Sequence, residues 1–216
     1  MTRAALGIGG FARLTGVSRE TLDRLANYVE LLISWNRRIN LVGRETIGDV
    51  WRRHILDSAQ LFPLIPPDAR RLIDLGSGAG LPGLVLAIMG VPEVHLIESD
   101  GRKAVFLREA VRLTDAPAVV HARRIDRVSP LLADVVTARA LAPLPALLEM
   151  SQRFLDPHGF CLFLKGRHVE EELTAARKEW NIRLNRQPSL TDPSGCILRL
   201  EGIAREPNIA LPARCS

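Results

Sequence analysis

The sequence predicts an α/β fold with a mostly parallel sheet covered by helices on both faces, and three observations lead to this prediction. Apolar segments of strand length alternate with amphipathic segments of helix length from residue 70 onward. A glycine-rich turn, residues 76–83, follows the first apolar segment. Aromatic residues make up only 5% of the chain, so the core must consist mainly of Leu, Val, Ile and Ala, which suits layered α/β packing.

The N-terminal part, residues 1–66, is expected to be a helical extension. Residues 1–17 are rich in glycine and are expected to be loosely held. Ser18 is the predicted N-cap of a first helix, whose apolar residues recur at helical spacing. A second helix is expected over about 46–62, ending at the proline-rich breaker 63–67.

Residues 67–206 are predicted to form the sheet domain, and residues 207–216 a tail. Strands are expected, in order, at 71–77, 94–99, 118–122, 134–140, 160–166, 183–190 and 195–204. Helices are expected at 81–89, at 102–113, from about 141 to 154 and at 168–180. Since no long helix separates the last two strands, we expect them to close the sheet as an antiparallel hairpin. The predicted sheet therefore has seven strands, mostly parallel, with an antiparallel strand at the end.

Positive charge is concentrated in two segments of the chain. The net charge is +5. Residues 101–127 contain seven Arg or Lys against three acidic residues, and residues 34–54 contain five Arg against two. Such clusters favour a polyanionic partner, and nucleic acid is the obvious candidate, although a solvated basic surface gives the same pattern.

Several other classes of protein find little support in the sequence. No apolar run approaches the roughly 18 residues of a membrane span, and the N-terminus lacks the pattern of a signal peptide. Cys161, Cys196 and Cys215 lie far apart without a CxxC pair, so no metal site is expected and the thiols are expected to be reduced and buried. We therefore expect a cytoplasmic monomer with no membrane partner.

The strongest local signal is the turn Asp74-Leu75-Gly76-Ser77-Gly78-Ala79-Gly80-Leu81-Pro82-Gly83. Residues 78–83 match the GxGxxG pattern of dinucleotide-binding folds, and Glu98 lies at the distance which that pattern requires. Pro82 argues against a dinucleotide, because a pyrophosphate needs free backbone N–H groups at the start of the helix and proline has none. A nicotinamide or flavin dinucleotide, and glycines used only for packing, stay as alternatives.

Acidic residues on both sides of the turn favour S-adenosylmethionine as the cofactor. Asp74, at the end of the first strand, is expected to face the cationic methionine part of the cofactor. Glu98, at the end of the second strand, is expected to accept hydrogen bonds from the ribose hydroxyls. Ile125 is expected to cover the adenine ring and Asp126 to accept from its amino group. For Asp126 the alternative is a surface carboxylate beside the neighbouring arginines.

Five segments together resemble one known family. They are Trp35-Asn36-Arg37-Arg38-Ile39-Asn40-Leu41, Arg53-His54-Ile55-Leu56-Asp57-Ser58, the glycine-rich turn, Ala138-Arg139-Ala140 and Leu164-Lys165-Gly166. In that order and spacing they resemble the glucose-inhibited division protein B family of ribosomal RNA small subunit methyltransferases G, over about residues 20–203. The turn alone indicates only a class I methyltransferase.

The resemblance implies a class I Rossmann-like methyltransferase fold with an N-terminal helical extension. It implies N7-methylation of one guanosine, position 527 of the reference numbering, in the 530 loop of 16S ribosomal RNA. The 30S subunit or its precursor is then the expected partner. The family pattern places the cofactor at the glycine turn, at Ile125 with Asp126, and at Arg139. The expected cofactor-binding residues are Asp74, Gly76, Ser77, Gly78, Gly80, Leu81, Glu98, Ile125, Asp126 and Arg139.

Guanine N7 carries a lone pair and no proton, so the proposed reaction needs no general base, and positioning is expected to supply the catalysis. Arg139 and Lys165 lie at the ends of the fourth and fifth predicted strands and are expected to position the base. Besides Lys165, the residues expected to contact RNA are Asn36, Asn40, His54, Asp57, Ser58, Arg123 and Arg124.

Simpler interpretations exist for several of these residues. Lys165 could be a surface lysine at a strand end. His54, Asp57 and Ser58, on one helix face, could instead dock that helix on the main domain. Asn36 and Asn40 are expected to share a helix face.

Three other functions stay open from the sequence. They are a methyltransferase acting on another RNA, a protein or a small molecule, a nicotinamide oxidoreductase, and a non-catalytic module that keeps the cofactor fold.

Overall fold

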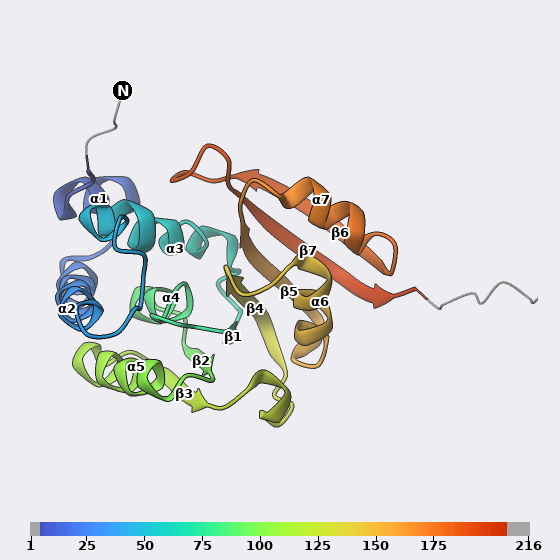
Figure 1. Cartoon of the computed structure of the whole chain (residues 1–216), viewed down its shortest axis with the longest axis horizontal. Coiled ribbons are helices and arrows are strands. Elements are labelled where there is room, and N and C mark those ends of the chain that lie inside the picture. Colours follow the sequence, from blue (N-terminus) through green and yellow to red (C-terminus); the bar gives the residue numbers. More distant parts are fainter. Residues whose placement is uncertain (1–4, 207–216) are drawn as a thin grey trace, which may run out of the picture.

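The computed structural model describes residues 5–206 and contains a seven-stranded sheet in the order β3-β2-β1-β4-β5-β7-β6 (Figure 1). The strands are β1 (Arg71–Leu75), β2 (Glu93–Glu98), β3 (Ala118–Ala122), β4 (Ala133–Arg139), β5 (Leu155–Lys165), β6 (Trp180–Pro188) and β7 (Cys196–Arg205). Strands β1 to β5 pair in parallel, whereas β7 is antiparallel to both β5 and β6. The predicted sheet and its closing hairpin are confirmed, and the antiparallel strand is inserted beside the edge strand β6.

Helices cover both faces of this sheet (Figure 1). They are α1 (Ile8–Thr15), α2 (Arg19–Asn36), α3 (Asp57–Ala59), α4 (Gly83–Met89), α5 (Gly101–Thr114), α6 (Leu144–Gln152) and α7 (Val169–Ala176). Neighbouring residues of β1 point to opposite faces: Leu72 joins the core under α1, α2, α4 and α5, and Ile73 joins the core under α6 and α7. Within residues 5–206, none of the helices combines the length and apolar character that a bilayer crossing requires.

The N-terminal segment is better ordered than its glycine content predicts. Residues 8–15 form α1, and Phe11 is fully buried with its ring centroid 5.3 Å from that of Trp51. The expectation of a loosely held segment over residues 1–17 is therefore wrong for its described part, because one aromatic side chain fixes the helix to the core. Residues 1–4, the tail 207–216 and Cys215 lie outside the described residues.

The single helix expected over residues 46–62 is also wrong. The chain there forms the short 3₁₀ helices η1 (Ile47–Asp49) and η3 (Phe62–Leu64), separated by the π-helix η2 (Trp51–Leu56) and the single turn α3. The Asp57 N–H donates to the Arg52 carbonyl five residues back, which is the hydrogen bond of a π turn. This wider turn buries Ile55 and Leu56 in the core and leaves His54 and Asp57 both in contact with the sheet.

The first predicted helix boundary is confirmed by its cap. The Ser18 hydroxyl accepts a hydrogen bond from the Thr21 N–H at 3.1 Å, which satisfies one free donor at the start of α2. At the other end, the Asn36 side-chain oxygen accepts from the N–H groups of Leu41 and Val42. Asn40 therefore lies beyond the helix, and the prediction that Asn36 and Asn40 share a helix face is wrong.

Replacing Phe11 by Ala tests whether α1 is an integral part of the fold. The substitution removes a fully buried ring, so we expect the free energy of unfolding to fall by about 3–5 kcal/mol. Leu14→Ala in the same helix is the control, because Leu14 is 64% exposed, and it is expected to change stability by less than about 0.5 kcal/mol. Urea unfolding followed by circular dichroism measures both. Equal stability of the two variants would show that α1 does not pack as described.

Candidate active site

The glycine turn joins β1 to α4 and uses its backbone donors within the protein. Gly76, Gly78 and Gly80 have φ values of 63°, 55° and 89°, which side-chain-bearing residues rarely adopt. The Ser77 N–H donates to Ile97 O, and the N–H groups of Gly80 and Leu81 donate to Ser77 O. The Gly78 N–H donates to Glu98 Oε2 at 2.8 Å. With Pro82 lacking an N–H, few donors are left for a pyrophosphate.

Tyr28, the only tyrosine in the sequence, supports the turn from α2. Its hydroxyl donates to Ala79 O at 2.6 Å, and the side chain is fully buried. Burial raises the pKa of Tyr28 well above its usual range, so the residue acts as a neutral donor. The sequence carries no local signal for this role, because the contact spans 51 residues. The helical extension therefore shapes the glycine turn directly.

A crevice of about 480 Å³ opens beside the turn. It brings together Gly76, Gly78, Glu98, Ile125, Asp126, Arg123 and Arg124, all of which the sequence predicts as site residues. Glu98 is 7% exposed, and its second oxygen accepts from the Asp100 N–H at 2.7 Å. Two backbone donors thus fix the carboxylate at the end of β2. Arg124 and Asp126 form an exposed ion pair with Nε and Oδ1 3.2 Å apart.

Asp74 lies beneath the turn and does not line this crevice. It is fully buried, and its Oδ1 accepts from the Thr137 hydroxyl at 2.8 Å. Burial raises the pKa of Asp74 to about 6, against the opposing effect of the Thr137 hydrogen bond. Within the described residues, Oδ2 has no hydrogen-bond partner. The predicted Ser77 and Leu81 are likewise buried rather than open to the crevice.

Arg139, at the end of β4, connects the sheet to the N-terminal segment. Its Nη1 lies 3.2 Å from Asp57 Oδ2 and donates to the Arg53 carbonyl, and its Nη2 contacts His54 Nδ1 at 3.2 Å. Because a guanidinium only donates, Nδ1 must accept and the imidazole proton lies on Nε2, 2.8 Å from the Thr46 hydroxyl. Burial, followed by the charges of Arg139 and Arg53, lowers the pKa of His54 to about 3.

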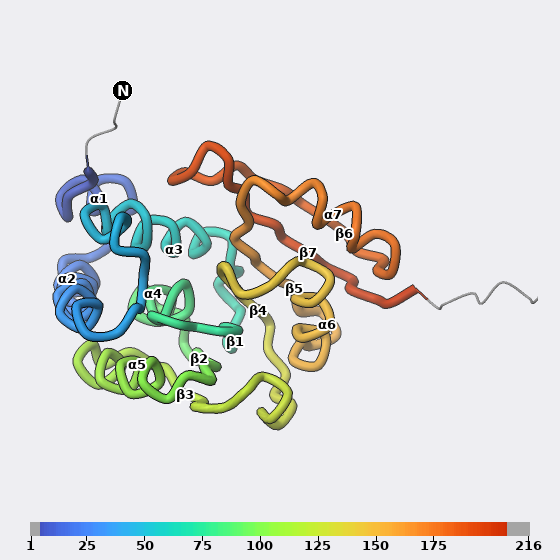
Figure 2. Tube along the Cα trace, viewed as in Figure 1, coloured from blue at the N-terminus to red at the C-terminus, as the bar shows by residue number. Residues whose placement is uncertain are grey.

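This arrangement supports the docking interpretation of His54, Asp57 and Ser58. The Ser58 hydroxyl donates back to His54 O, so it is used within its own helical turn. Asp57 Oδ1 accepts from the hydroxyl of Thr191, which lies on the turn between β6 and β7. The same turn also contacts the end of α3, where the Leu190 N–H donates to the Gln60 side-chain oxygen (Figure 2). Asp57 also lines a cavity.

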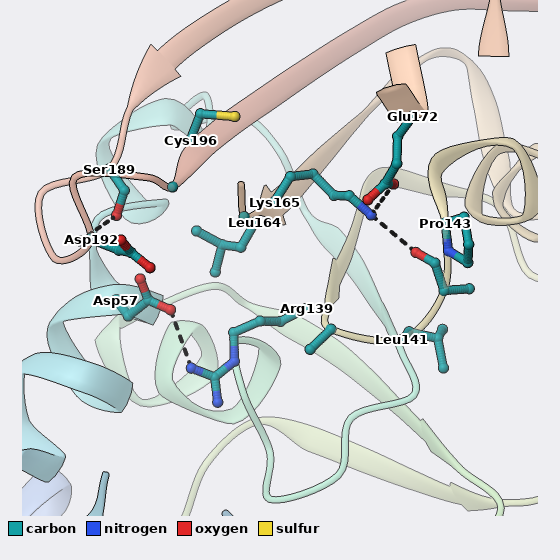
Figure 3. A pocket seen from close by; sticks show the side chains of 14 residues that line it. Asp57, Arg139, Leu141, Pro143, Leu164, Lys165, Glu172, Ser189, Asp192 and Cys196 are labelled. Atoms are coloured by element: carbon teal, nitrogen blue, oxygen red, sulfur yellow. Dashed lines mark hydrogen bonds and ion pairs between the residues drawn. The ribbon is translucent and has the colours of Figure 1, made fainter. Parts of the chain in front are cut away.

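A second cavity, of about 420 Å³, is lined in part by Arg139 (Figure 3). Its lining includes Asp57, Arg139, Lys165, Glu172, Asp192 and Cys196. The Lys165 side chain is 9% exposed, and its Nζ lies 2.5 Å from Glu172 Oε2 and 3.0 Å from Ala142 O. Lys165 is therefore a nearly buried, paired lysine and not the surface residue of the alternative interpretation.

The two cavities have Ala140 and Leu141 in common. Ala140 has φ 51°, an uncommon conformation for a residue with a side chain. A Cβ atom on Gly76 would lie 2.5 Å from Leu141 Cδ1, so this leucine packs directly on the glycine turn. Residues 140–141 therefore form part of the wall of each cavity. Leu141 and Glu172 were not among the site residues predicted from the sequence.

Other predicted residues stay apart from this junction. Asn40 is exposed, and Asn36 is used in ending α2. Within residues 5–206, no three His, Cys, Asp or Glu side chains gather as a metal site would need.

Comparisons with known proteins show the family and the fold. The GidB family model, described as rRNA small subunit methyltransferase G, matches residues 21–194. The Ribosomal RNA small subunit methyltransferase G of Paramagnetospirillum magneticum is 62% identical over 191 residues, covering 88% of this chain and 93% of that protein. The protein of the same description from Rhodospirillum centenum is 63% identical over 194 residues, covering 90% of each chain.

Solved structures of lower sequence similarity share the fold. A ribosomal protein L11 methylase from Lactobacillus delbrueckii has a TM-score of 0.56 at 14% identity, covering 68% of this chain and 76% of that one. A TehB-like SAM-dependent methyltransferase from Corynebacterium glutamicum has a TM-score of 0.55 at 16% identity, covering 82% and 98%. The predicted class I methyltransferase fold is thereby confirmed.

The lowered pKa of His54 predicts a loss of stability in mild acid. The unfolded chain takes up a proton near pH 6.5, whereas the folded chain does so only near pH 3, so stability falls as the pH falls between these values. Between pH 6.5 and 5 this effect reaches about 2 kcal/mol. Asp74, whose pKa is raised, acts in the opposite direction over part of the range.

Comparison with a His54→Gln variant isolates the histidine from Asp74. Urea unfolding at pH 7 and pH 5 is expected to show a larger loss for the wild type than for the variant. An equal loss in both proteins would mean that His54 is not held neutral in the folded state.

Proposed function

The chain belongs to the ribosomal RNA small subunit methyltransferase G family, and from that premise we propose that it methylates N7 of one guanosine in the 530 loop of 16S ribosomal RNA. Membership of this family makes it an S-adenosylmethionine-dependent enzyme that acts on small-subunit ribosomal RNA. The observation that supports the proposal most strongly is that two cavities share Ala140 and Leu141 in their linings. We assign the crevice at the glycine turn to the cofactor and the Arg139 cavity to the target base.

The crevice fits a sulfonium nucleoside better than a dinucleotide. Most donors of the turn are used internally, so a phosphate would find little to bind, whereas a sulfonium nucleoside has no phosphate to bind there. At Gly78 a Cβ atom would meet only Gly76 O within 4 Å, which leaves the turn open to close approach. Glu98 would accept from the ribose hydroxyls, Ile125 would cover the adenine and Asp126 would accept from its amino group.

Asp74 plays a different part from the one its position in the motif predicts. As a buried carboxylate bonded to Thr137, it holds β1 and β4 together below the turn. A Cβ atom on Gly83 would lie 2.6 Å from Asp74 Cβ, so the start of α4 packs directly on this side chain. We propose that Asp74 stabilises the cationic cofactor through its charge from below, without lining the crevice.

Methylation of N7 requires that the base and the methyl group be positioned, but it requires no proton transfer. The bound cofactor supplies an electrophilic methyl group on sulfur, and guanine N7 offers an in-plane lone pair to it. Arg139 and Lys165 would hold the base so that N7 points towards residues 140–141. His54 has no proton-transfer task, because its Nδ1 is occupied by Arg139.

A cysteine-dependent methylation of cytosine is disfavoured by the thiols of the described chain. Burial raises the pKa of Cys161 to about 12 and also raises that of Cys196. A nucleophilic cysteine needs a stabilised thiolate, and both environments work against it.

The substrate RNA would meet a basic rim. Lys103, Arg123 and Arg124 line the mouth of the cofactor crevice, and the last two are exposed. Side chains cannot read the deep major groove of A-form RNA, so the target guanosine must come from a loop or turn outward. We propose that the protein acts as a monomer on the 30S subunit or its precursor, in the cytoplasm where that substrate is found.

The test is methyl transfer to 30S subunits from a strain that lacks this protein. Incubation with tritiated S-adenosylmethionine is expected to label one nucleotide, and mass mapping is expected to identify it as 7-methylguanosine. Lys165→Ala is expected to lower kcat/KM about 10- to 100-fold, because a hydrogen bond from a charged group is lost. Its affinity for S-adenosylhomocysteine, measured by calorimetry, is expected to stay unchanged.

Lys178→Ala is the matched control, since Lys178 is exposed and lies outside both cavities. Full activity of Lys165→Ala would show that Lys165 does not bind the target base. Labelling of soluble proteins in place of 30S subunits would contradict the proposed substrate. Binding of NADH without binding of S-adenosylhomocysteine would contradict the cofactor.

A further inference from the structure

The ion pair between Lys165 and Glu172 projects into the Arg139 cavity (Figure 3). Lys165 comes from the end of β5 and Glu172 from α7, and their side chains are 9% and 20% exposed. Transfer of a methyl group from sulfur to N7 does not require such an ion pair. A buried charge is costly unless it is paired and hydrogen-bonded, and the contacts that fix this pair indicate its role.

Both partners are held in place by groups outside the pair. Glu172 Oε2 accepts from the Leu144 N–H at 2.7 Å, and the closest contact with Lys165 Nζ uses the same oxygen. Lys165 Nζ also donates to Ala142 O. Both side-chain contacts of Glu172 therefore use Oε2, and Oε1 remains available as an acceptor on a residue that lines the cavity. A fixed donor and a fixed acceptor stand side by side.

Other carboxylates of the cavity are less suited to bind a ligand. Asp57 uses Oδ2 for Arg139 and Oδ1 for Thr191 and Gln60. Asp192 uses Oδ1 for the backbone and hydroxyl of Ser194 in the exposed turn. Glu172 combines an ion pair with Lys165 and a second oxygen, Oε1, that has no hydrogen-bond partner among the described residues.

We propose that Glu172 and Lys165 select guanine, with Lys165 donating to O6 and Glu172 accepting from N1–H and the N2 amino group. This inference rests on the proposed function and deepens it. Guanine presents O6, N1–H and N2–H in sequence along one edge, so a donor beside a carboxylate matches it. Adenine presents an amino group and a bare N1 in the same places, which sets donor against donor and acceptor against acceptor.

The same contacts account for the choice of nitrogen. O6 lies between N1 and N7 on the rim of guanine, so a base held at O6 and N1 leaves N7 uncovered on the adjoining edge. N1 and N2, engaged by Glu172, are withdrawn from methyl transfer. The cavity volume of about 420 Å³ falls within the usual range for small-molecule pockets, in accord with a single base turned out of the RNA.

The experiment combines a protein change with a base change. Reconstituted 30S subunits carry either guanosine or inosine at the target position; inosine lacks the N2 amino group and keeps O6, N1–H and N7. Wild-type protein is expected to lose about tenfold or more in kcat/KM on inosine. In Glu172→Gln the amide oxygen still accepts from Leu144, so its NH₂ group faces the cavity and accepts nothing. For Glu172→Gln we expect kcat/KM on guanosine RNA to be about tenfold lower than for the wild type. We also expect its kcat/KM on guanosine RNA to be about equal to its kcat/KM on inosine RNA.

Glu171→Gln is the matched control on the same helix, because Glu171 is exposed and outside both cavities; it is expected to keep the wild-type ratio. Affinity for S-adenosylhomocysteine is expected to be the same in all three proteins. The unfolding midpoint is expected to stay unchanged in Glu171→Gln and to fall in Glu172→Gln, because Lys165 loses its charged partner. A wild-type ratio retained by Glu172→Gln would overturn the inference. Equal rates of the wild type on both RNAs would overturn it without any variant. Failure of the wild type to methylate either RNA would instead contradict the proposed function on which it rests.

Discussion

The hydrogen bonds of Arg139 connect the sheet to the N-terminal segment at the site. Its guanidinium binds Asp57, His54 and the Arg53 carbonyl, and so it joins the end of β4 to the turn of π-helix that precedes α3. The residue that follows it, Ala140, adopts a left-handed conformation, after which Leu141 packs on Gly76. The end of β4 therefore carries Arg139 at the second cavity and leads directly into Ala140 and Leu141, which line both cavities.

The N-terminal helices belong to the site as well as to the fold. Tyr28 binds the carbonyl of the glycine turn from one side, and Glu98 binds its Gly78 N–H from the other. A turn fixed in this way is prepared before any ligand arrives, and preorganisation is the main source of rate in a reaction without proton transfer. The neutral His54 and the paired Lys165 follow the same pattern, since each charged or polar group near the junction is held by a partner of its own.

The alternation of apolar and amphipathic segments was sufficient to predict the sheet, its closing hairpin and the position of the glycine turn. Local patterns failed where a distant contact decides the outcome. Phe11 orders a glycine-rich segment by reaching Trp51, and the acid before the turn, Asp74, is fully buried, which its place in the motif did not indicate. Leu141 and Glu172 carry no motif, because their roles arise only when the loop after β4 and the helix after β5 are brought together.

We propose that cofactor and base occupy separate cavities which share Ala140 and Leu141. This arrangement is tested most directly by an electron cryomicroscopy structure of the protein bound to a 30S subunit with S-adenosylhomocysteine. The account predicts the cofactor sulfur beside Gly76 and one guanine turned out into the cavity of Arg139, Lys165 and Glu172. A guanine that reaches the cofactor from any other side, with that cavity left free of the base, would contradict it.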